Sequence, residues 1–245
     1  MNIYLTIIYK DKMYNIEDDY IIFYEKPTKE ELYNLPLTKM FYDCDKELDE
    51  NFKNSNITYL KFGNNFNQQV DNLPTTLNIL FFGQNFNQPV DNLPKNLKKI
   101  VFGWKFNQPV DNLPKNLKKI VFERYFNQSV DNLPENLTVL KFGYYFNQSV
   151  DNLPNSLEYL QFGRNFNQPV DNLPPNLKYL VLGYYFNQSL DFLPYSLEEL
   201  IILNPNYSYD LLNLPNSLKK LKICIDYKGT INLPQNCIFE PYLKN

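Results

Sequence analysis

The tripeptide Phe-Asn-Gln occurs seven times in this chain, and successive copies begin 20 residues apart. The copies begin at Phe66, Phe86, Phe106, Phe126, Phe146, Phe166 and Phe186. A period this strict indicates one supersecondary unit that is stacked on itself, so that each copy contacts only its neighbours. The repeat constrains the fold more than any other feature of the sequence, because it predicts one elongated solenoid.

The second half of each unit has the spacing of a leucine-rich-repeat strand. In the unit that begins at Phe86, the apolar positions are Leu97, Ile100 and Phe102, and alternation puts the last two on one face of a strand. The pattern recurs at Leu77/Leu80/Phe82, Leu117/Ile120/Phe122, Leu137/Leu140/Phe142, Leu157/Leu160/Phe162, Leu177/Leu180/Leu182 and Leu197/Leu200/Ile202.

The apolar pattern also extends beyond the Phe-Asn-Gln copies. It continues upstream at Ile57/Leu60/Phe62 and Leu37/Met40/Tyr42, and downstream, after a one-residue insertion near residues 204–206, at Leu218/Leu221/Ile223. This gives about ten coils. Stacked at the ~4.8 Å interstrand spacing, they should form one parallel sheet and a body roughly 45–50 Å long.

The segments between the strands are expected to be extended or to form short 3₁₀ turns. A Leu-Pro pair recurs in every unit, as at Leu93-Pro94, and proline both lacks an N–H and biases its predecessor toward extended geometry. Six of the seven glycines follow the last core residue of a strand, which indicates either positive φ or close packing of adjacent coils. Glu123 interrupts this glycine series. The predicted fold class is therefore a mainly β, leucine-rich-repeat-like solenoid.

The chain is expected to form one continuous domain with capped ends. Residues 1–36 should be an N-terminal cap, with strands at Ile3–Tyr9 and Tyr20–Tyr24 and a short helix that begins near Lys29 after the capping box Thr28–Glu31. Residues 37–224 should hold the repeats, and residues 225–245 a C-terminal cap. Glu240 and Pro241 are predicted on core and strand positions, which would end the stack.

Composition weighs against several functional classes. The formal net charge is −3, so no nucleic-acid or membrane partner is expected, and no apolar run is long enough to span a bilayer. Because the chain has no histidine, nucleophile elbow, phosphate loop or metal cluster, neither enzymatic activity nor a cofactor is expected. Three cysteines without motif spacing favour an intracellular setting, and residues 1–10 are interpreted as a strand and not as a signal peptide.

These motifs resemble the FNIP repeat family, which occurs in social amoebae and in giant viruses that infect amoebae. The matching elements are Phe-Asn-Gln-(Pro/Ser)-(Val/Leu), Leu-Pro-x-(Asn/Ser)-Leu and (Leu/Ile)-x-Phe-Gly, over about Ile57 to Ile223. The resemblance implies a leucine-rich-repeat-like solenoid with a role in protein interaction. In giant viruses such repeats often follow an F-box-like segment that would recruit a ubiquitin ligase, but residues 1–56 match such a segment poorly.

Three invariant columns are interpreted as structural. The phenylalanines at Phe66 to Phe186 should stack ~4.8 Å apart in the core. The asparagines that follow them should form a buried ladder, and these are Asn67, Asn87, Asn107, Asn127, Asn147, Asn167 and Asn187. The aspartates from Asp71 to Asp191 must be solvated, hydrogen-bonded to turn N–H groups or neutralised, and turn capping is preferred over a cation site.

The positions that vary between repeats are better candidates for binding. A row of residues typical of interface hot spots follows the strands, and it comprises Gln84, Trp104, Arg124, Tyr144, Arg164 and Tyr184 with Lys105, Tyr125, Tyr145 and Tyr185 beside them. Lys98, Lys99, Lys118 and Lys119 predict a basic patch on the early coils, while Glu158, Glu198 and Glu199 predict more acidic late coils. An ordinary mixed surface, or stacking of the aromatic residues on one another, would give the same pattern.

Two classes of function remain after this reasoning. The leading hypothesis is a non-enzymatic scaffold that binds a protein partner through its concave face and the row beside it. The alternative is a structural or assembly component, for example of a virion, and this leaves self-association open. A substrate adaptor for ubiquitination without a recognisable F-box is a further alternative that follows from the family resemblance.

Overall fold

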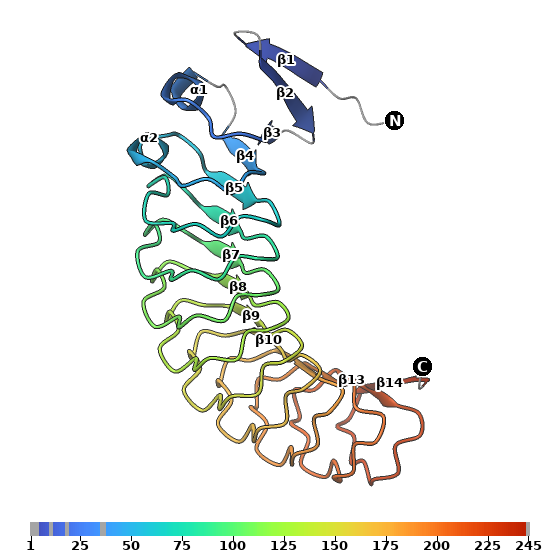
Figure 1. Ribbon diagram of the computed structural model, residues 1–245. Helices are drawn as coiled ribbons and strands as arrows, with labels where there is room; N and C mark the ends of the chain where they lie inside the picture. Colours follow the sequence, from blue (N-terminus) through green and yellow to red (C-terminus); the bar gives the residue numbers. More distant parts are fainter. Residues whose placement is uncertain (1–4, 10–11, 18–19, 35–37, 244–245) are drawn as a thin grey trace.

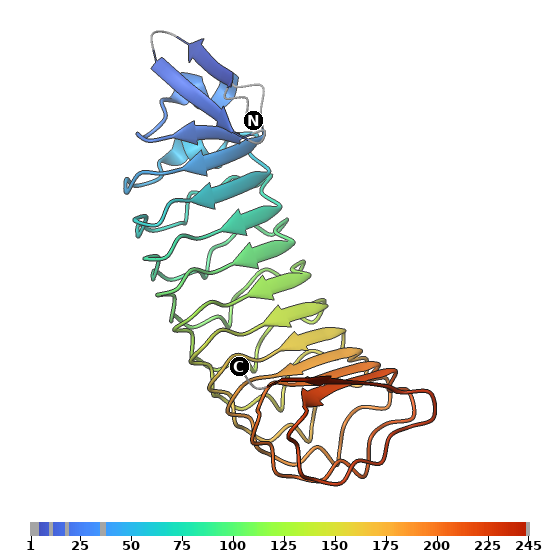
Figure 2. The ribbon, with the colours of Figure 1, turned by 90° about the vertical axis from the view of Figure 1, so that its right-hand side faces the viewer.

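The protein is a curved solenoid whose strands all belong to one sheet. The computed structural model describes residues 5–9, 12–17, 20–34 and 38–243. Its fourteen strands follow one another in the sheet in chain order, and every pair from β3 to β14 is parallel. The sheet lines the inner side of the curve and the turns lie outside it (Figure 1). Figure 2 shows this concave face with the strands stacked side by side. The predicted fold class is confirmed.

The first three strands form an antiparallel meander before the parallel stack begins. They are β1 (Leu5–Tyr9), β2 (Lys12–Glu17) and β3 (Tyr20–Phe23). The parallel strands that follow β3 are β4 (Lys39–Tyr42), β5 (Tyr59–Phe62), β6 (Ile79–Phe81), β7 (Lys99–Val101), β8 (Lys119–Val121), β9 (Val139–Lys141), β10 (Tyr159–Gln161), β11 (Tyr179–Leu182), β12 (Glu199–Ile202), β13 (Lys220–Cys224) and β14 (Ile238–Tyr242). Leu37, an expected core residue of the first coil, lies outside the described residues.

Two short helices lie on the outer side of the first coils (Figure 1). Helix α1 (Lys29–Asn34) begins at the predicted capping box. The Glu31 carboxylate accepts from the Thr28 N–H at 2.6 Å, and the Thr28 hydroxyl oxygen accepts from the Glu31 N–H at 3.3 Å, so the box is confirmed. Helix α2 (Glu50–Lys53) is capped by Asp49, whose carboxylate accepts hydrogen bonds from two backbone N–H groups. Burial raises the pKa of Asp49, but Lys26 and these two hydrogen bonds outweigh burial, so the pKa is lowered overall.

The core is a set of columns in which like residues lie over like residues. Leu97, Ile100 and Phe102 are fully buried, as their equivalents are along the repeat, and the Phe66-to-Phe186 column is no more than 1% exposed. Within a coil, Phe102 and Phe106 stack with ring centroids 3.9 Å apart. The core role of the Phe-Asn-Gln phenylalanine is therefore confirmed.

The predicted ring spacing along this column is wrong. The ring centroids of Phe86 and Phe106 lie 6.0 Å apart, and those of Phe126 and Phe146 lie 6.1 Å apart. Both distances exceed the ~4.8 Å expected from the strand separation. Phenylalanines just after the strands are closer, as at Phe102 and Phe122, whose centroids are 5.3 Å apart. The curvature explains the difference, because coils that are close together at the sheet fan apart toward the outer side.

Single turns connect the strands on the outer side. The Leu97 N–H donates to the Pro94 carbonyl at 3.1 Å, and the same three-residue bond recurs at each Leu-Pro pair of the central coils. No α-helix occurs among described residues 54–243. Proline explains this result, because it fixes φ and supplies no N–H for a continuing helix.

Close packing, and not positive φ, explains the recurring glycine. No glycine in the described chain has a positive φ. A Cβ placed on Gly143 would overlap the carbonyl of Glu123 in the preceding coil, and one on Gly163 would overlap the carbonyl of Gly143. Adjacent coils therefore touch backbone to backbone at this position.

The phenylalanine column continues past the last Phe-Asn-Gln copy in a form that the motif does not show. Tyr207 is 3% exposed and stacks on Phe186 at 6.3 Å, and Tyr227 stacks on Tyr207 at 6.0 Å. The one-residue insertion near residues 204–206 is accommodated at Asn204, whose buried side chain donates a hydrogen bond to the Phe186 carbonyl at 3.0 Å. The extra residue thus leaves the core column unbroken.

The prediction that Glu240 occupies a core position is wrong. Asn236 has a φ of 67°, and β14 pairs with β13 so that Phe239 lies beside Leu221 and Glu240 beside Lys222. This shift of register turns Glu240 to the concave surface. Pro241 does lie in the strand, beside Ile223, and β14 is the last strand of the described sheet.

We expect Gly143→Ala to destabilise the fold by about 1–3 kcal/mol, because the added methyl must push two coils apart. Urea denaturation followed by circular dichroism measures the change. Glu123→Ala is the matched control, since this residue already carries a Cβ at the same position of its coil. Equal stability of the wild type and Gly143→Ala would show that the coils are not in tight backbone contact.

Candidate functional site

The concave surface is built from the two outward positions of each short strand. In β7 the side chain of Ile100 is buried, while Lys99 and Val101 are partly exposed on the other face of the sheet. The strand register aligns these positions into two rows along the solenoid. One row includes Tyr59, Ile79, Lys99, Lys119, Val139, Tyr159 and Tyr179, and the other includes Lys61, Phe81, Val101, Val121, Lys141, Gln161 and Val181.

The structure divides the predicted basic patch into two parts. Lys99 and Lys119 are neighbours on the concave sheet. Lys98 and Lys118 precede the strands and are exposed at the margin of that sheet. Lys141, which sequence reasoning missed, extends the patch on the sheet because its strand β9 pairs with β8. The strand alternation that placed Ile120 in the core could have identified Lys141 as well.

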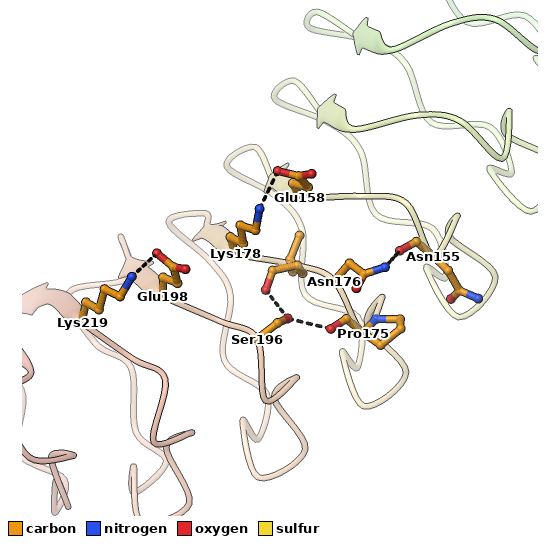
Figure 3. A network of polar contacts seen from close by, with 9 residues as sticks. Asn155, Glu158, Pro175, Asn176, Lys178, Ser196, Glu198 and Lys219 are labelled. Carbon is orange, nitrogen blue, oxygen red and sulfur yellow. Dashed lines mark hydrogen bonds and ion pairs between the residues drawn. The ribbon is translucent and has the colours of Figure 1, made fainter.

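The three glutamates that were predicted to make the late coils more acidic each pair with a lysine of the next coil. Lys178 pairs with Glu158 at 3.0 Å and Lys219 pairs with Glu198 at 2.7 Å (Figure 3). Lys220 also lies 3.6 Å from Glu199. The same view shows coil-to-coil hydrogen bonds nearby, such as the Ser196 hydroxyl to the Pro175 carbonyl at 2.7 Å.

The residues that follow the strands form an alternating row of aromatic and arginine side chains. We name as the aromatic–arginine row Trp104, Arg124, Tyr144, Arg164 and Tyr184, with the adjoining Tyr125, Tyr145 and Tyr185. The Arg124 guanidinium lies 5.9 Å from the ring of Trp104 and 5.6 Å from that of Tyr144. Arg164 likewise lies 5.7 Å from Tyr144 and 4.6 Å from Tyr184. Each arginine thus bridges aromatic rings of the coils on both sides.

The row is held in place yet remains accessible. Its backbone is hydrogen-bonded from coil to coil, as where the Tyr125 N–H donates to the Trp104 carbonyl at 2.9 Å. Tyr125 and Tyr145 stack at 5.2 Å. Trp104, Tyr125 and Tyr185 are nevertheless 44%, 44% and 51% exposed. The alternative that these aromatic residues pack on one another is therefore realised, and their outer faces are still free for contact with solvent or a partner.

The asparagine ladder exists, but the prediction that it is buried is wrong. The Asn107 N–H donates to the Asn87 side-chain oxygen at 2.9 Å, and the bond repeats at Asn127, Asn147, Asn167 and Asn187. These asparagines are partly or fully exposed, because they lie at the outer surface of the coil. The glutamine of the motif, which the sequence left unplaced, supports the same ladder, as where Gln108 donates to the Asn87 carbonyl at 3.2 Å.

The aspartate column belongs to a second ladder. The Asn112 side-chain N–H donates to the Asp91 carboxylate at 3.0 Å, and Asn152 donates to Asp131 at 3.1 Å. The carboxylates are therefore exposed and hydrogen-bonded, but to side-chain amides of the next coil and not to turn N–H groups. Hydrogen bonds from Ser149 and from Asn172 lower the pKa of Asp151. This arrangement explains how a column of like charges is tolerated.

Two negative findings concern the described residues. No group of three or more His, Cys, Asp or Glu side chains in the described chain could hold a metal ion. No helix among these residues combines the length and apolarity that crossing a bilayer requires.

Comparison with known proteins identifies the repeat. The FNIP Repeat family model matches residues 34–85, 86–112, 126–165, 149–172 and 166–204, which together cover more than half of the chain. The chain belongs to the FNIP repeat family. None of the curated proteins compared with it matches.

Two solved structures show the same architecture. CroV588, described as a novel circular LRR protein, is 38% identical with a TM-score of 0.75, and the match covers 86% of this chain and 38% of CroV588. YopM from Yersinia enterocolitica WA-314 is 19% identical with a TM-score of 0.54, covering 86% of this chain and 52% of YopM. This FNIP protein therefore has the leucine-rich-repeat fold and spans well under two thirds of either protein.

We expect Arg124→Ala to expose Trp104, because the guanidinium lies over the indole ring. Trp104 is the single tryptophan, so acrylamide quenching of its fluorescence reports on this contact alone. Quenching should increase in Arg124→Ala and stay unchanged in Arg164→Ala, whose side chain contacts Tyr144, Tyr184 and Tyr185 instead. Identical quenching in both variants would contradict the bridging role of Arg124.

Proposed function

We propose that this protein is a non-enzymatic scaffold that binds a protein partner through its concave face and the aromatic–arginine row. The observation that carries the proposal is that the invariant positions of each repeat maintain the fold, while the variable positions are exposed. The invariant phenylalanine and leucine positions are buried, and the invariant asparagines join one coil to the next. The positions that vary between repeats are exposed, and they include the concave surface and the row as well as the turn residue after each Leu-Pro pair.

The composition of the row supports a binding role. Trp, Tyr and Arg are the side chains that most often dominate the energy of protein interfaces. Here they are fixed by coil-to-coil contacts before any partner arrives, so little side-chain entropy is lost on binding. Leucine-rich-repeat solenoids, whose fold this chain shares, generally use their extended concave surfaces for recognition and not for catalysis.

The cysteines fit an intracellular place of action. Cys44, Cys224 and Cys237 are all unpaired, and burial raises the pKa of the Cys44 and Cys237 thiols. A reducing compartment keeps such thiols free.

A paired set of variants tests the proposal. Trp104→Ala with Tyr185→Ala removes two exposed rings of the row, whereas Phe192→Ala with Tyr195→Ala removes two exposed rings from the turns that precede β12. The tagged chain is used to capture proteins from an amoebal lysate, and captured proteins are identified by mass spectrometry. The row variant should lose by about tenfold or more a protein that the wild type and the control variant retain.

Thermal unfolding and sedimentation of the same samples complete the experiment. The two double variants should melt within a few degrees of the wild type, because the mutated rings are exposed. Equal capture by the row variant and the wild type would refute binding through the row. A stable oligomer in dilute solution would favour an assembly role, for which the edge strands of the described sheet, β1 and β14, offer a route.

A further inference from the structure

The middle of the concave sheet carries lysines without any acidic side chain. From β5 to β11 its two rows contain Lys61, Lys99, Lys119 and Lys141, and no Asp or Glu. The whole chain has a net charge of −3, so this positive surface is a segregation of charge and not a reflection of composition.

These lysines are packed on the sheet but have no anionic partner. The Lys99 ammonium lies 4.6 Å from the centre of the Phe81 ring, and the Lys141 ammonium lies 4.7 Å from that of Tyr159. Lys119 lies between them, and its pKa is lowered by burial and then by the charges of Lys99 and Lys141. No carboxylate of the described chain lies within ion-pair distance of these three lysines, so none of the described acidic residues relieves their mutual repulsion.

The last coils show how the same sheet treats lysines when it satisfies them itself. Lys220 and Lys222 occupy the same two concave rows in β13. Glu240 of β14 lies 2.6 Å from Lys220 and 3.1 Å from Lys222. Charge pairing is thus used near the end of this sheet, whereas the lysines of β7 to β9 have no carboxylate partner among the described residues.

We propose that the concave sheet around Lys99, Lys119 and Lys141 binds an acidic, extended peptide segment of the protein partner. The inference rests on the proposed function and adds the chemistry of the segment that is recognised. Carboxylates of the segment would relieve the repulsion among the three ammonium groups. Charge complementarity of this kind selects partners and speeds their association.

The dimensions suit a short run of carboxylates. β7, β8 and β9 are adjacent, so the three lysines extend over ~10 Å, a distance that three or four residues of extended chain cover. Valines lie between the lysines at Val101, Val121 and Val139, and Phe81 and Tyr159 lie on either side. The segment should therefore have an acidic centre with apolar residues on both sides. A nucleic acid is disfavoured, because the patch is short and the chain as a whole would repel a long polyanion.

Fluorescence anisotropy with a labelled peptide tests the proposal directly. The probe is a peptide of about twelve residues with four central Asp and Glu residues flanked by Leu and Phe, and its control replaces the acids by Asn and Gln. The acidic peptide should bind at least ~10-fold more tightly than its amide counterpart at low salt, and the difference should shrink as salt is added.

Matched protein variants locate the binding. The triple variant Lys99→Gln, Lys119→Gln and Lys141→Gln should lose ~10-fold or more of the affinity, while Lys53→Gln, Lys95→Gln and Lys115→Gln, with the same change of charge away from the concave sheet, should lose less than ~3-fold. Circular dichroism melting checks that both variants fold.

Three results would overturn the inference: no binding of the acidic peptide, equal loss in both triple variants, or tighter, lysine-dependent binding of an oligouridylate of the same charge. None of these results would alter capture through the aromatic–arginine row, so the two proposals can fail separately.

Discussion

Neighbouring coils of this solenoid are held together by hydrogen bonds between equivalent positions. The Lys118 N–H donates to the Lys98 carbonyl at 2.8 Å, and the Asn127 N–H donates to the Asn107 side chain at 2.9 Å. Because the bonds connect equivalent positions, a residue that suits one coil must suit the coils above and below it. This requirement explains why the repeat is so regular, and why a backbone contact allows only glycine at most copies of its position.

The same requirement separates structure from recognition. Positions that meet their own copies in the core or in a ladder are not free to vary without disturbing two interfaces. Side chains on the concave sheet and in the aromatic–arginine row face outward, so they are under weaker constraint. Differences among repeats therefore accumulate on the exposed surface, which includes the concave sheet and the row. The strands β7 to β9, which carry the lysines, lie on the inner side of the curve (Figure 2), and the row begins three residues after each of these strands in the chain.

Much of the architecture could be predicted, since period and alternation determine which side chains are buried. The strand pattern, the phenylalanine column, the capping box at Thr28 and the lack of α-helix in the repeats all follow from local chemistry. Two predictions that were wrong, the ring spacing and the core position of Glu240, depend on the three-dimensional arrangement of the coils. Ring spacing depends on curvature, which a period does not reveal. The register of Glu240 differs from the repeat by one residue, and this shift follows Asn236, whose φ is positive.

The site was harder to predict than the fold. The sequence identified the aromatic–arginine row, but it could not show that each arginine bridges two rings. The glutamates of the late coils were identified from the sequence, but their lysine partners were not, because pairing across coils depends on which side chains share a row. Lys61 and Lys141 were missed although each lies between two core positions of its strand, so that alternation alone places it on the concave face.

Hydrogen bonds between equivalent positions of neighbouring coils hold the molecule together, and removal of one whole coil tests this most directly. Deletion of residues 106–125 joins Lys105 to Phe126 and would bring Ile100 beside Leu140. Urea denaturation should then show a single cooperative transition close to that of the full chain, while deletion of residues 106–115 leaves half a coil that cannot match its neighbours and should abolish it. Equal stability of the two deletions would contradict the account.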